Sequence, residues 1–274
     1  MPPDNDTPDL VQLDRDHPGF RDPLYRRRRN GIAQAALDYH RGDPMPEIAY
    51  SREEHDVWRI ALEHLAPLHA RYACRQFQEH FPSLRLPPDR VPSFRAVNRL
   101  LEAATGFRLV PVAGLVSPRA FMSRLAQREF LATQYIRHHS APLYTPEPDI
   151  IHEICGHAAL LAEPRFAEVN RRFGDAALRA DESQIDALIR VYWFALEFGV
   201  VREGDALCVV GAGLLSSFGE LGRFEREAEL RPFDLAAIAA TPFDTSSYQD
   251  VLFVAASTDL LLGSLSRWLE GFGA

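Results

Sequence analysis

Two histidines in the segment PEPDIIHEICGHAALLAEP, which runs from Pro146 to Pro164, have the chemistry of metal ligands. His152 and His157 lie among apolar residues, where a neutral imidazole with a free ring nitrogen suits a divalent cation. Glu153 follows the first histidine, but three residues separate it from His157. The spacing therefore differs from the HExxH motif of zinc proteases, and a zinc hydrolase is the weaker metal-dependent alternative.

The five-residue spacing also constrains the backbone between the histidines. A regular α-helix turns about 100° per residue, so the two imidazoles would diverge by about 140° and could not easily share one small ion. Gly156 argues against an undisturbed helix, because glycine in a helix interior costs about 1 kcal/mol relative to alanine. We therefore predict a local widening or distortion near Gly156 that brings His152 and His157 together.

Glu197, in the segment VYWFALEFGVV, is the candidate third ligand. Apolar residues flank it on both sides, and an ionised carboxylate buried there without a partner would cost several kcal/mol. Two histidines and one carboxylate form the facial triad of non-haem Fe(II) oxygenases, which leaves positions open for O₂ and substrate. The spacing alone leaves another interpretation open, in which the histidines are hydrogen-bonded core residues and Glu197 pairs with an arginine.

Helices are predicted to position these residues. Pro148 can occupy the first turn of the helix that carries the histidines, and Asp149 favours that end electrostatically. Hydrophobic periodicity and capping signals predict further helices over residues 51–81, 93–106, 117–138 and 184–200, and an extended segment over residues 107–116. We find no internal repeat or long linker, so we expect a single, mainly α domain with a small β ribbon.

The composition is that of an ordinary globular protein and narrows the choice of partners. Of the 274 residues, 46% are hydrophobic and 25% are charged. A formal net charge of -8 and a pI near 5.7 argue against nucleic acid or an anionic membrane as the main partner. No stretch reaches the roughly 18 apolar residues of a membrane span, and the N-terminus lacks a signal-peptide pattern. We therefore expect a cytoplasmic protein.

Longer segments resemble a known family in order and spacing. TQYIRHHSAPLYTPEPDIIHEICGHAALLAEPRFAE, VYWFALEFGV and GAGLLSSFGEL are similar to the catalytic domain of the aromatic amino acid hydroxylases, and so are DHPGFRDPLYRRRR and TGFRLVPVAGLVSPRAF. The resemblance covers residues 15 to 260 or so. It implies a helical catalytic domain that uses Fe(II), a tetrahydropterin (tetrahydrobiopterin or a related one) and O₂ to hydroxylate the ring of an aromatic amino acid.

The resemblance also implies a role for individual residues. Fe(II) would be held by His152, His157 and Glu197, with Asp149, Tyr192 and Ser216 around them. The pterin would contact Gly114, Val116, Pro118, Phe121 and Glu153. The amino acid would contact Arg137, Thr145, Trp193, Phe198, Val210, Gly213 and Ser216. The Arg137 guanidinium would pair with the substrate carboxylate, and a structural salt bridge is the alternative role for this residue.

Val210 is the departure from the family pattern that bears on the substrate. An aromatic residue, usually Tyr, commonly precedes GAGLL in phenylalanine and tyrosine hydroxylases, and a smaller side chain beside the ring would admit a shifted or larger substrate. The YWF triplet and SSFGEL nevertheless resemble the phenylalanine enzymes. We expect L-phenylalanine to be hydroxylated to L-tyrosine. Meta hydroxylation or tryptophan hydroxylation are the alternatives, and a zinc hydrolase or a non-catalytic binding protein are more remote ones.

Composition and the extent of the resemblance together suggest how the chain is divided. Residues 1–15 are predicted to be a flexible N-terminal tail, and residues 16–274 the catalytic domain. We expect no regulatory domain and no heptad tail that would build a tetramer, and therefore a monomer or weak dimer.

Overall fold

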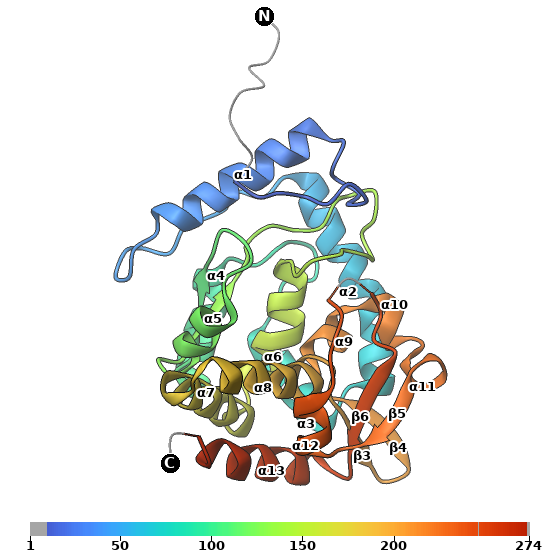
Figure 1. The fold of residues 1–274 in the computed structure, drawn as a ribbon. Helices are drawn as coiled ribbons and strands as arrows, with labels where there is room; N and C mark the ends of the chain where they lie inside the picture. The colour runs from blue at the N-terminus through green and yellow to red at the C-terminus, as the bar shows by residue number, and fades with distance from the viewer. Residues whose placement is uncertain (1–9, 246, 273–274) are drawn as a thin grey trace, which may run out of the picture.

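Helices dominate the computed structural model, which describes residues 10–245 and 247–272 (Figure 1). The predicted N-terminal tail lies outside the described residues up to residue 9. Helix α1 (Pro23–Asp38) lies across one end of the molecule and α13 (Thr258–Glu270) across the other (Figure 1). The predicted mainly α fold class is confirmed.

Local sequence signals set several helix ends as predicted. Helix α2 (Arg52–Tyr72) begins with a capping box, in which Ser51 Oγ accepts from Glu54 N at 3.2 Å and Glu54 Oε2 accepts from Ser51 N at 2.7 Å. Helix α4 (Phe94–Thr105) ends at Gly106, whose φ of 78° lies in the left-handed region that favours glycine.

The predicted helix over residues 51–81 is divided, because the chain leaves the helix to pair elsewhere. After α2, Cys74 N donates to Val209 O at 2.9 Å. The chain then resumes as α3 (Arg75–His80) and the 3₁₀ turn η1 (Phe81–Leu84). A contact with a residue distant in the sequence therefore outweighs continuous helical periodicity.

The predicted helix over residues 117–138 is wrong in its second half. Helix α5 covers Pro118–Leu125, and the chain then turns through Arg128 at a φ of 55°. Strand β2 (Glu129–Ala132) pairs in parallel with β1 (Arg108–Pro111), and Phe130 lies opposite Leu109. Since a short buried apolar run fits strand and helix equally well, pairing with β1 decided the outcome.

A second, four-stranded sheet was not predicted. Its strands are β3 (Val200–Glu203), β4 (Ala206–Val209), β5 (Glu229–Pro232) and β6 (Val251–Ala255), in the order β4-β3-β6-β5. The β3–β4 hairpin is antiparallel, and the other two pairings are parallel. The sheet lies beside the helical body, at the lower right of Figure 1. Strands this short carry little alternating pattern for sequence analysis to detect.

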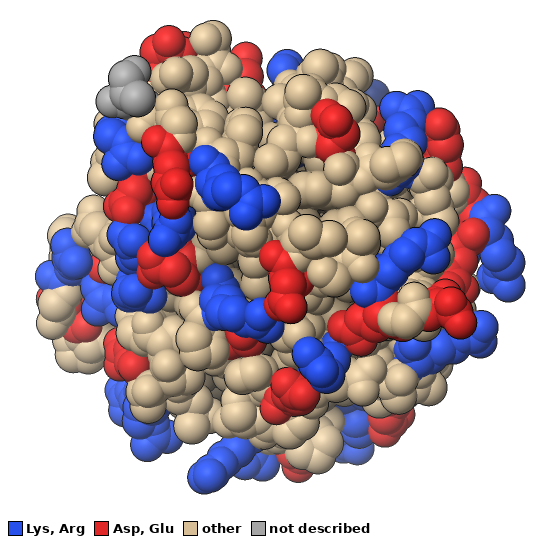
Figure 2. All heavy atoms as spheres, turned by 90° about the horizontal axis from the view of Figure 1, so that it is seen from below, with Lys and Arg blue, Asp and Glu red and all other residues tan. Residues whose placement is uncertain are grey.

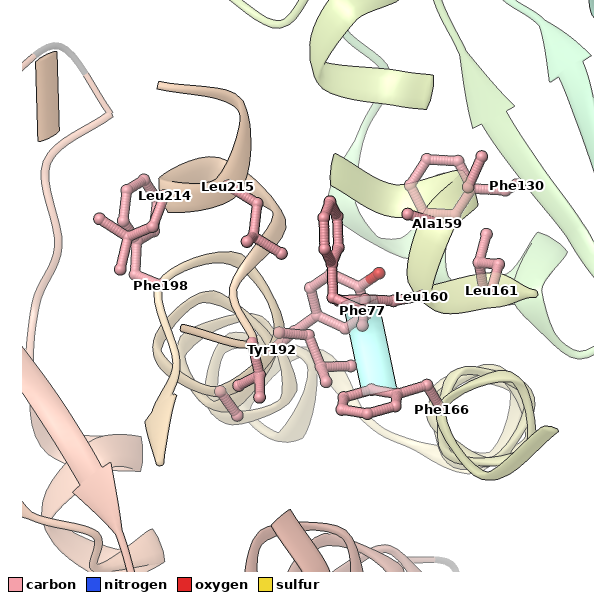
Figure 3. Close-up of a cluster of buried hydrophobic side chains, with 14 of the residues drawn as sticks. Phe77, Phe130, Ala159, Leu160, Leu161, Phe166, Tyr192, Phe198, Leu214 and Leu215 are labelled. Atoms are coloured by element: carbon pink, nitrogen blue, oxygen red, sulfur yellow. The ribbon is translucent and has the colours of Figure 1, made fainter. Parts of the chain in front are cut away.

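The remaining helices surround the segments that carry the candidate ligands. They are α6 (Ala159–Leu161), α7 (Pro164–Arg179), α8 (Glu182–Tyr192), α9 (Ala212–Ser216), α10 (Phe218–Leu221), α11 (Phe224–Glu227) and α12 (Leu235–Ala240). Their apolar side chains join one buried cluster, to which Leu160 of α6, Phe166 of α7 and Tyr192 of α8 belong (Figure 3).

The surface carries charges of both signs. On the face shown in Figure 2, acidic and basic side chains lie next to one another rather than in separate fields. In the described part of the chain, no helix combines the length and apolar character needed to cross a lipid bilayer.

Candidate functional site

The segment with the two histidines forms a π-helix, η2, from His152 to Ala158. In a π-helix the hydrogen bonds join residues five apart, so His152 and His157 lie one turn apart on the same side. Their Nε2 atoms are 3.0 Å apart, as the predicted distortion near Gly156 requires. A Cβ atom added at Gly156 would lie 2.6 Å from the carbonyl oxygen of Ala212, so this glycine permits the close packing of η2 on α9.

A second π-helical turn, η3 (Trp193–Glu197), presents Glu197. Regular helix α8 ends at Tyr192, which corrects the single helix predicted over residues 184–200, and Phe198 N donates to Trp193 O at 2.8 Å. Glu197 Oε1 lies 3.0 Å from His157 Nε2, and Glu197 Oε2 lies 3.7 Å from His152 Nε2. Two irregular helical turns therefore bring three donor side chains together.

These three donors fit a single divalent cation. Metal–ligand bonds of about 2.0–2.2 Å place neighbouring donor atoms about 3 to 3.5 Å apart, close to the observed separations. Ser216 Oγ donates to the Ala212 carbonyl at 2.8 Å and lies 2.9 Å from His152 Nδ1. Because its hydrogen is engaged there, Ser216 Oγ accepts from His152 Nδ1–H. His152 Nε2 then keeps the lone pair that a metal ion needs.

Burial and mutual charge set the protonation of the three side chains. Burial, followed by the charge of His157, lowers the pKa of His152 to about 4. Burial opposes ionisation of Glu197, but the charge and hydrogen bond of His157 outweigh it and hold the pKa of Glu197 below its ordinary value. Burial likewise opposes the charge on His157, whose pKa Glu197 nevertheless raises. The two opposite shifts express the attraction between His157 and Glu197, and a cation bound between the donors would compensate the Glu197 charge in place of a proton on His157.

Glu153 also lies near the two imidazoles, with a carboxylate oxygen within 4.8 Å of their nitrogens. Its Oε1 is engaged elsewhere, because it accepts from Thr133 N at 3.0 Å and from Thr133 Oγ1 at 3.1 Å. Burial raises the pKa of Glu153 to about 7. Glu197, which contacts His157 directly, is the better third ligand.

Arg137 forms the structural ion pair that was considered as its alternative role. Its Nε and Nη2 donate to the two carboxylate oxygens of Asp149, each at 2.8 Å, and both side chains are buried. Asp149 Oδ1 also accepts from His152 N at 3.3 Å, so it caps the metal-binding helix rather than contacting a ligand side chain. Pro148 precedes this cap and lies outside the helix, in contrast to its predicted place in the first turn. Arg137 Nη1 makes no hydrogen bond to a described residue.

Two cavities meet at the three donors. The first has a volume of about 460 Å³ and the second about 260 Å³, and His152, Glu197 and Trp193 line both. Predicted substrate contacts that line the first cavity are Arg137, Thr145, Trp193, Phe198, Gly213 and Ser216. Every predicted pterin contact lines the second cavity, namely Gly114, Val116, Pro118, Phe121 and Glu153.

Val210 lines neither cavity, in contrast to its predicted place beside the substrate ring. It is fully buried, and its backbone N donates to Gly199 O at 3.0 Å, so it belongs to the packing where β4 leads into α9. The structure therefore gives no support to the inference that Val210 makes room for a larger substrate. Tyr192 also differs from its expected role, because its hydroxyl donates to Asn170 Oδ1 at 2.8 Å rather than to a ligand, although its ring lines the second cavity.

Sequence reasoning missed several residues that line the first cavity. Glu147 borders both cavities, and Glu220, Tyr248 and Gln249 border the first. Gln249 Oε1 accepts from the indole nitrogen of Trp193 at 2.9 Å, which ties the loop before β6 to η3. Glu147 stands within the PEPD stretch and could have been singled out. The polar loop around Tyr248 carries no pattern that marks it as a cavity wall.

The geometry agrees with comparisons to known proteins. A family model described as "biopterin-dependent aromatic amino acid hydroxylase" matches residues 9–271. Rat phenylalanine-4-hydroxylase is 43% identical over 252 residues, which are 90% of this chain and 56% of that protein. Dog tyrosine 3-monooxygenase is 44% identical over 250 residues, covering 89% of this chain and 50% of that protein. The chain thus spans about half the length of these relatives.

The fold is also similar to the solved structures of phenylalanine hydroxylases. Phenylalanine hydroxylase from Chromobacterium violaceum, with bound iron(III) and 7,8-dihydrobiopterin, superimposes with a TM-score of 0.79 at 30% identity. The match covers 95% of this chain and 92% of that one. The enzyme from Legionella pneumophila gives a TM-score of 0.77 at 30% identity, over 85% of this chain and 92% of that one. This chain therefore belongs to the biopterin-dependent aromatic amino acid hydroxylase family.

Proposed function

We propose that this chain is an iron- and tetrahydropterin-dependent monooxygenase that hydroxylates L-phenylalanine to L-tyrosine. One observation carries the proposal: the donor set of His152, His157 and Glu197 lies where two cavities meet. The first cavity offers a guanidinium and aromatic walls for an amino acid, and the second offers an aromatic side chain and a carboxylate for a pterin.

His152, His157 and Glu197 would hold Fe(II) and leave coordination positions open toward both cavities. Fe(II) and the tetrahydropterin, when bound, supply the activation of O₂, and the protein supplies binding, orientation and a dry site. Ser216 contributes by fixing the tautomer and ring orientation of His152. Such partners of metal ligands commonly affect metal affinity by roughly 10- to 100-fold.

Arg137 would bind the substrate carboxylate through the edge of its guanidinium that Asp149 does not occupy. The rings of Trp193 and Phe198, with centroids 4.7 Å apart, would form the wall against the phenyl ring. Gly213 fits this wall closely, since a Cβ atom there would lie 2.7 Å from Phe198 Cζ. The structural ion pair and the substrate contact are compatible, because the ion pair holds the Arg137 guanidinium in place.

The pterin would lie in the second cavity. Phe121 lines this cavity and is held edge-on by Phe130 and Tyr192, with centroid distances of 5.3 and 5.7 Å. Gly114, Val116 and Pro118 provide the neighbouring loop, and Glu153 would accept N–H groups from the pterin edge. This arrangement gives Glu153 a contact that does not involve the metal.

Phenylalanine is favoured as substrate by the YWF and SSFGEL segments, and tyrosine is the second candidate because tyrosine 3-monooxygenases match the chain equally well. The test is product identification by chromatography and mass spectrometry. Iron-loaded protein would be incubated with phenylalanine, tyrosine or tryptophan, a tetrahydropterin and O₂. L-Tyrosine from phenylalanine is expected, whereas meta-tyrosine or turnover of another amino acid alone would contradict the assignment. Hydrolytic activity with zinc and without pterin would point to the remote alternative.

Two substitutions test the donor set directly. His152→Ala and Glu197→Ala should abolish iron retention and hydroxylation together, because each removes one of three ligands. His64→Ala is the matched control, since His64 is an exposed histidine on α2. Metal analysis after gel filtration measures retention, and full activity in a variant that no longer holds iron would refute the site.

We further propose that residues 16–274 act as one catalytic domain and that the protein is a cytoplasmic monomer or weak dimer, as the sequence suggests. Analytical ultracentrifugation tests the oligomeric state, and imaging of the tagged full-length protein tests its location in the cell.

A further inference from the structure

An α-amino acid carries an ammonium group as well as a carboxylate, and the contacts described so far account only for the carboxylate and the ring. Three glutamates line the first cavity: Glu147, Glu197 and Glu220. Glu197 belongs to the metal donors. Glu147 pairs with Arg29 Nη1 at 3.0 Å and lies 3.6 Å from His17 Nε2. Glu220 remains as the carboxylate available to a cation in this cavity.

The local structure turns Glu220 away from its usual partner. It occupies the third position of α10 after the N-cap Ser217, where a glutamate commonly reaches back to the N-cap N–H, as Glu54 does on α2. In α10, Ser217 N instead donates to Leu214 O at 3.2 Å. Glu220 Oε1 accepts from Gln249 N at 2.9 Å, so the carboxylate faces the loop before β6 and borders the cavity.

Among the described residues, Arg223 is the one cation whose charge acts on the Glu220 carboxylate. Arg223 is itself engaged, because its Nε donates to Gly219 O at 2.6 Å and its Nη1 pairs with Glu227 at 3.4 Å. Its guanidinium also lies over the ring of Tyr248, 4.9 Å from the centroid. Burial raises the pKa of Glu220, and the Gln249 N–H, the Ser217 hydroxyl and the charge of Arg223 offset this only in part. A partly buried carboxylate without a matching cation favours a positively charged ligand.

We propose that Glu220 binds the α-ammonium group of the substrate while Arg137 binds its carboxylate. This inference rests on the proposed function, and it assigns the ligand class more narrowly. The first cavity then selects zwitterionic α-amino acids over deaminated acids that carry the same ring. Glu220 also links substrate to the loop of Tyr248 and Gln249, because the same carboxylate accepts the Gln249 N–H.

The test compares two ligands that differ only in the ammonium group, L-phenylalanine and 3-phenylpropanoate. Glu220→Gln removes the charge and keeps an oxygen that can accept from Gln249 N. Calorimetry on the iron-loaded protein without O₂ should show L-phenylalanine binding weakened by about 10- to 100-fold, the loss expected of one charge-assisted hydrogen bond. Binding of 3-phenylpropanoate should be unchanged or tighter, and KM for phenylalanine should rise more than kcat falls.

Two further variants make the outcome specific. Glu225→Gln removes an exposed charge from α11 outside the cavity and should change neither affinity. Glu220→Asp keeps the charge and should retain most of the preference for L-phenylalanine over 3-phenylpropanoate. This variant also provides a test if Glu220→Gln does not fold. Equal weakening of both ligands in Glu220→Gln would mean that Glu220 only holds the loop, and unchanged phenylalanine binding would likewise overturn the proposal. If the unmodified protein hydroxylates no aromatic amino acid, the proposed function itself fails.

Discussion

Replacing Gly156 by alanine tests whether the π-helix must approach α9 as closely as the structure shows. The added Cβ atom would lie 2.6 Å from Ala212 O and 3.0 Å from Ala212 Cβ, whereas ordinary contacts begin near 3.4 Å. Because the nearest atom belongs to the backbone, η2 and α9 would have to separate by about 0.8 Å, and overpacking of this kind costs about 1–3 kcal/mol.

The higher helix propensity of alanine offsets part of this overpacking cost in Gly156→Ala. Alanine gains about 0.5–1 kcal/mol over glycine in a helix interior, so the net destabilisation by Gly156→Ala should be about 1 kcal/mol, the middle of a range that reaches about 2.5 kcal/mol. A loss of about 1 kcal/mol corresponds to a fall in Tm of roughly 2–4 °C for a domain of this size. Gly31→Ala is the matched control, because a Cβ atom at this exposed position of α1 meets nothing within 4 Å. The control should be stabilised by up to about 1 kcal/mol.

The separation of η2 and α9 in Gly156→Ala should also disturb the metal site. Ala212 and Ser216 both belong to α9, and an outward shift of this helix would break the 2.9 Å contact between Ser216 Oγ and His152 Nδ1. Iron affinity should therefore fall by roughly 10-fold or more in Gly156→Ala and stay constant in Gly31→Ala. Thermal unfolding and competition with a metal chelator measure the two effects. Equal stabilisation of both variants, with unchanged iron affinity, would refute the packing argument.

Three further predictions concern buried groups. Val210→Tyr should overpack a fully buried position and lower stability by about 1–3 kcal/mol without changing the product; an altered product ratio would contradict the placement of Val210 away from the cavities. Asp149→Asn should lower the free energy of unfolding in urea by about 3–5 kcal/mol, because it leaves the buried Arg137 charge unpaired. A loss below about 1 kcal/mol would show that another group holds Arg137. Burial lowers the pKa of His69 to about 4, whereas the unfolded chain titrates near 6.5. The contribution of neutral His69 to the free energy of unfolding is therefore complete above pH 6.5. It is lost as the pH falls toward 4, by up to about 3 kcal/mol. The slope of unfolding free energy over this range should flatten in His69→Gln, and an unchanged slope would exclude His69 as its source.

The sequence by itself determined the features that depend on neighbouring residues. The capping box of Ser51 and Glu54 and the left-handed Gly106 follow from backbone hydrogen-bonding needs within one turn. The five-residue spacing of His152 and His157 predicted a distorted helix if the two share one metal ion, and burial of Glu197 in an apolar segment required a partner. Each of these conclusions needs only local geometry and the high cost of burying polar groups alone.

Only the tertiary structure decided which distant segments meet. Strand β2 formed because β1 was available to pair with it, and the four-stranded sheet unites strands from positions 200 to 255. Val210 lies outside both cavities and Glu220 borders the first for the same physical reason: side-chain direction depends on packing against elements far along the chain. A residue's type therefore predicts the chemistry it can do, whereas long-range packing decides which cavity, if any, it faces.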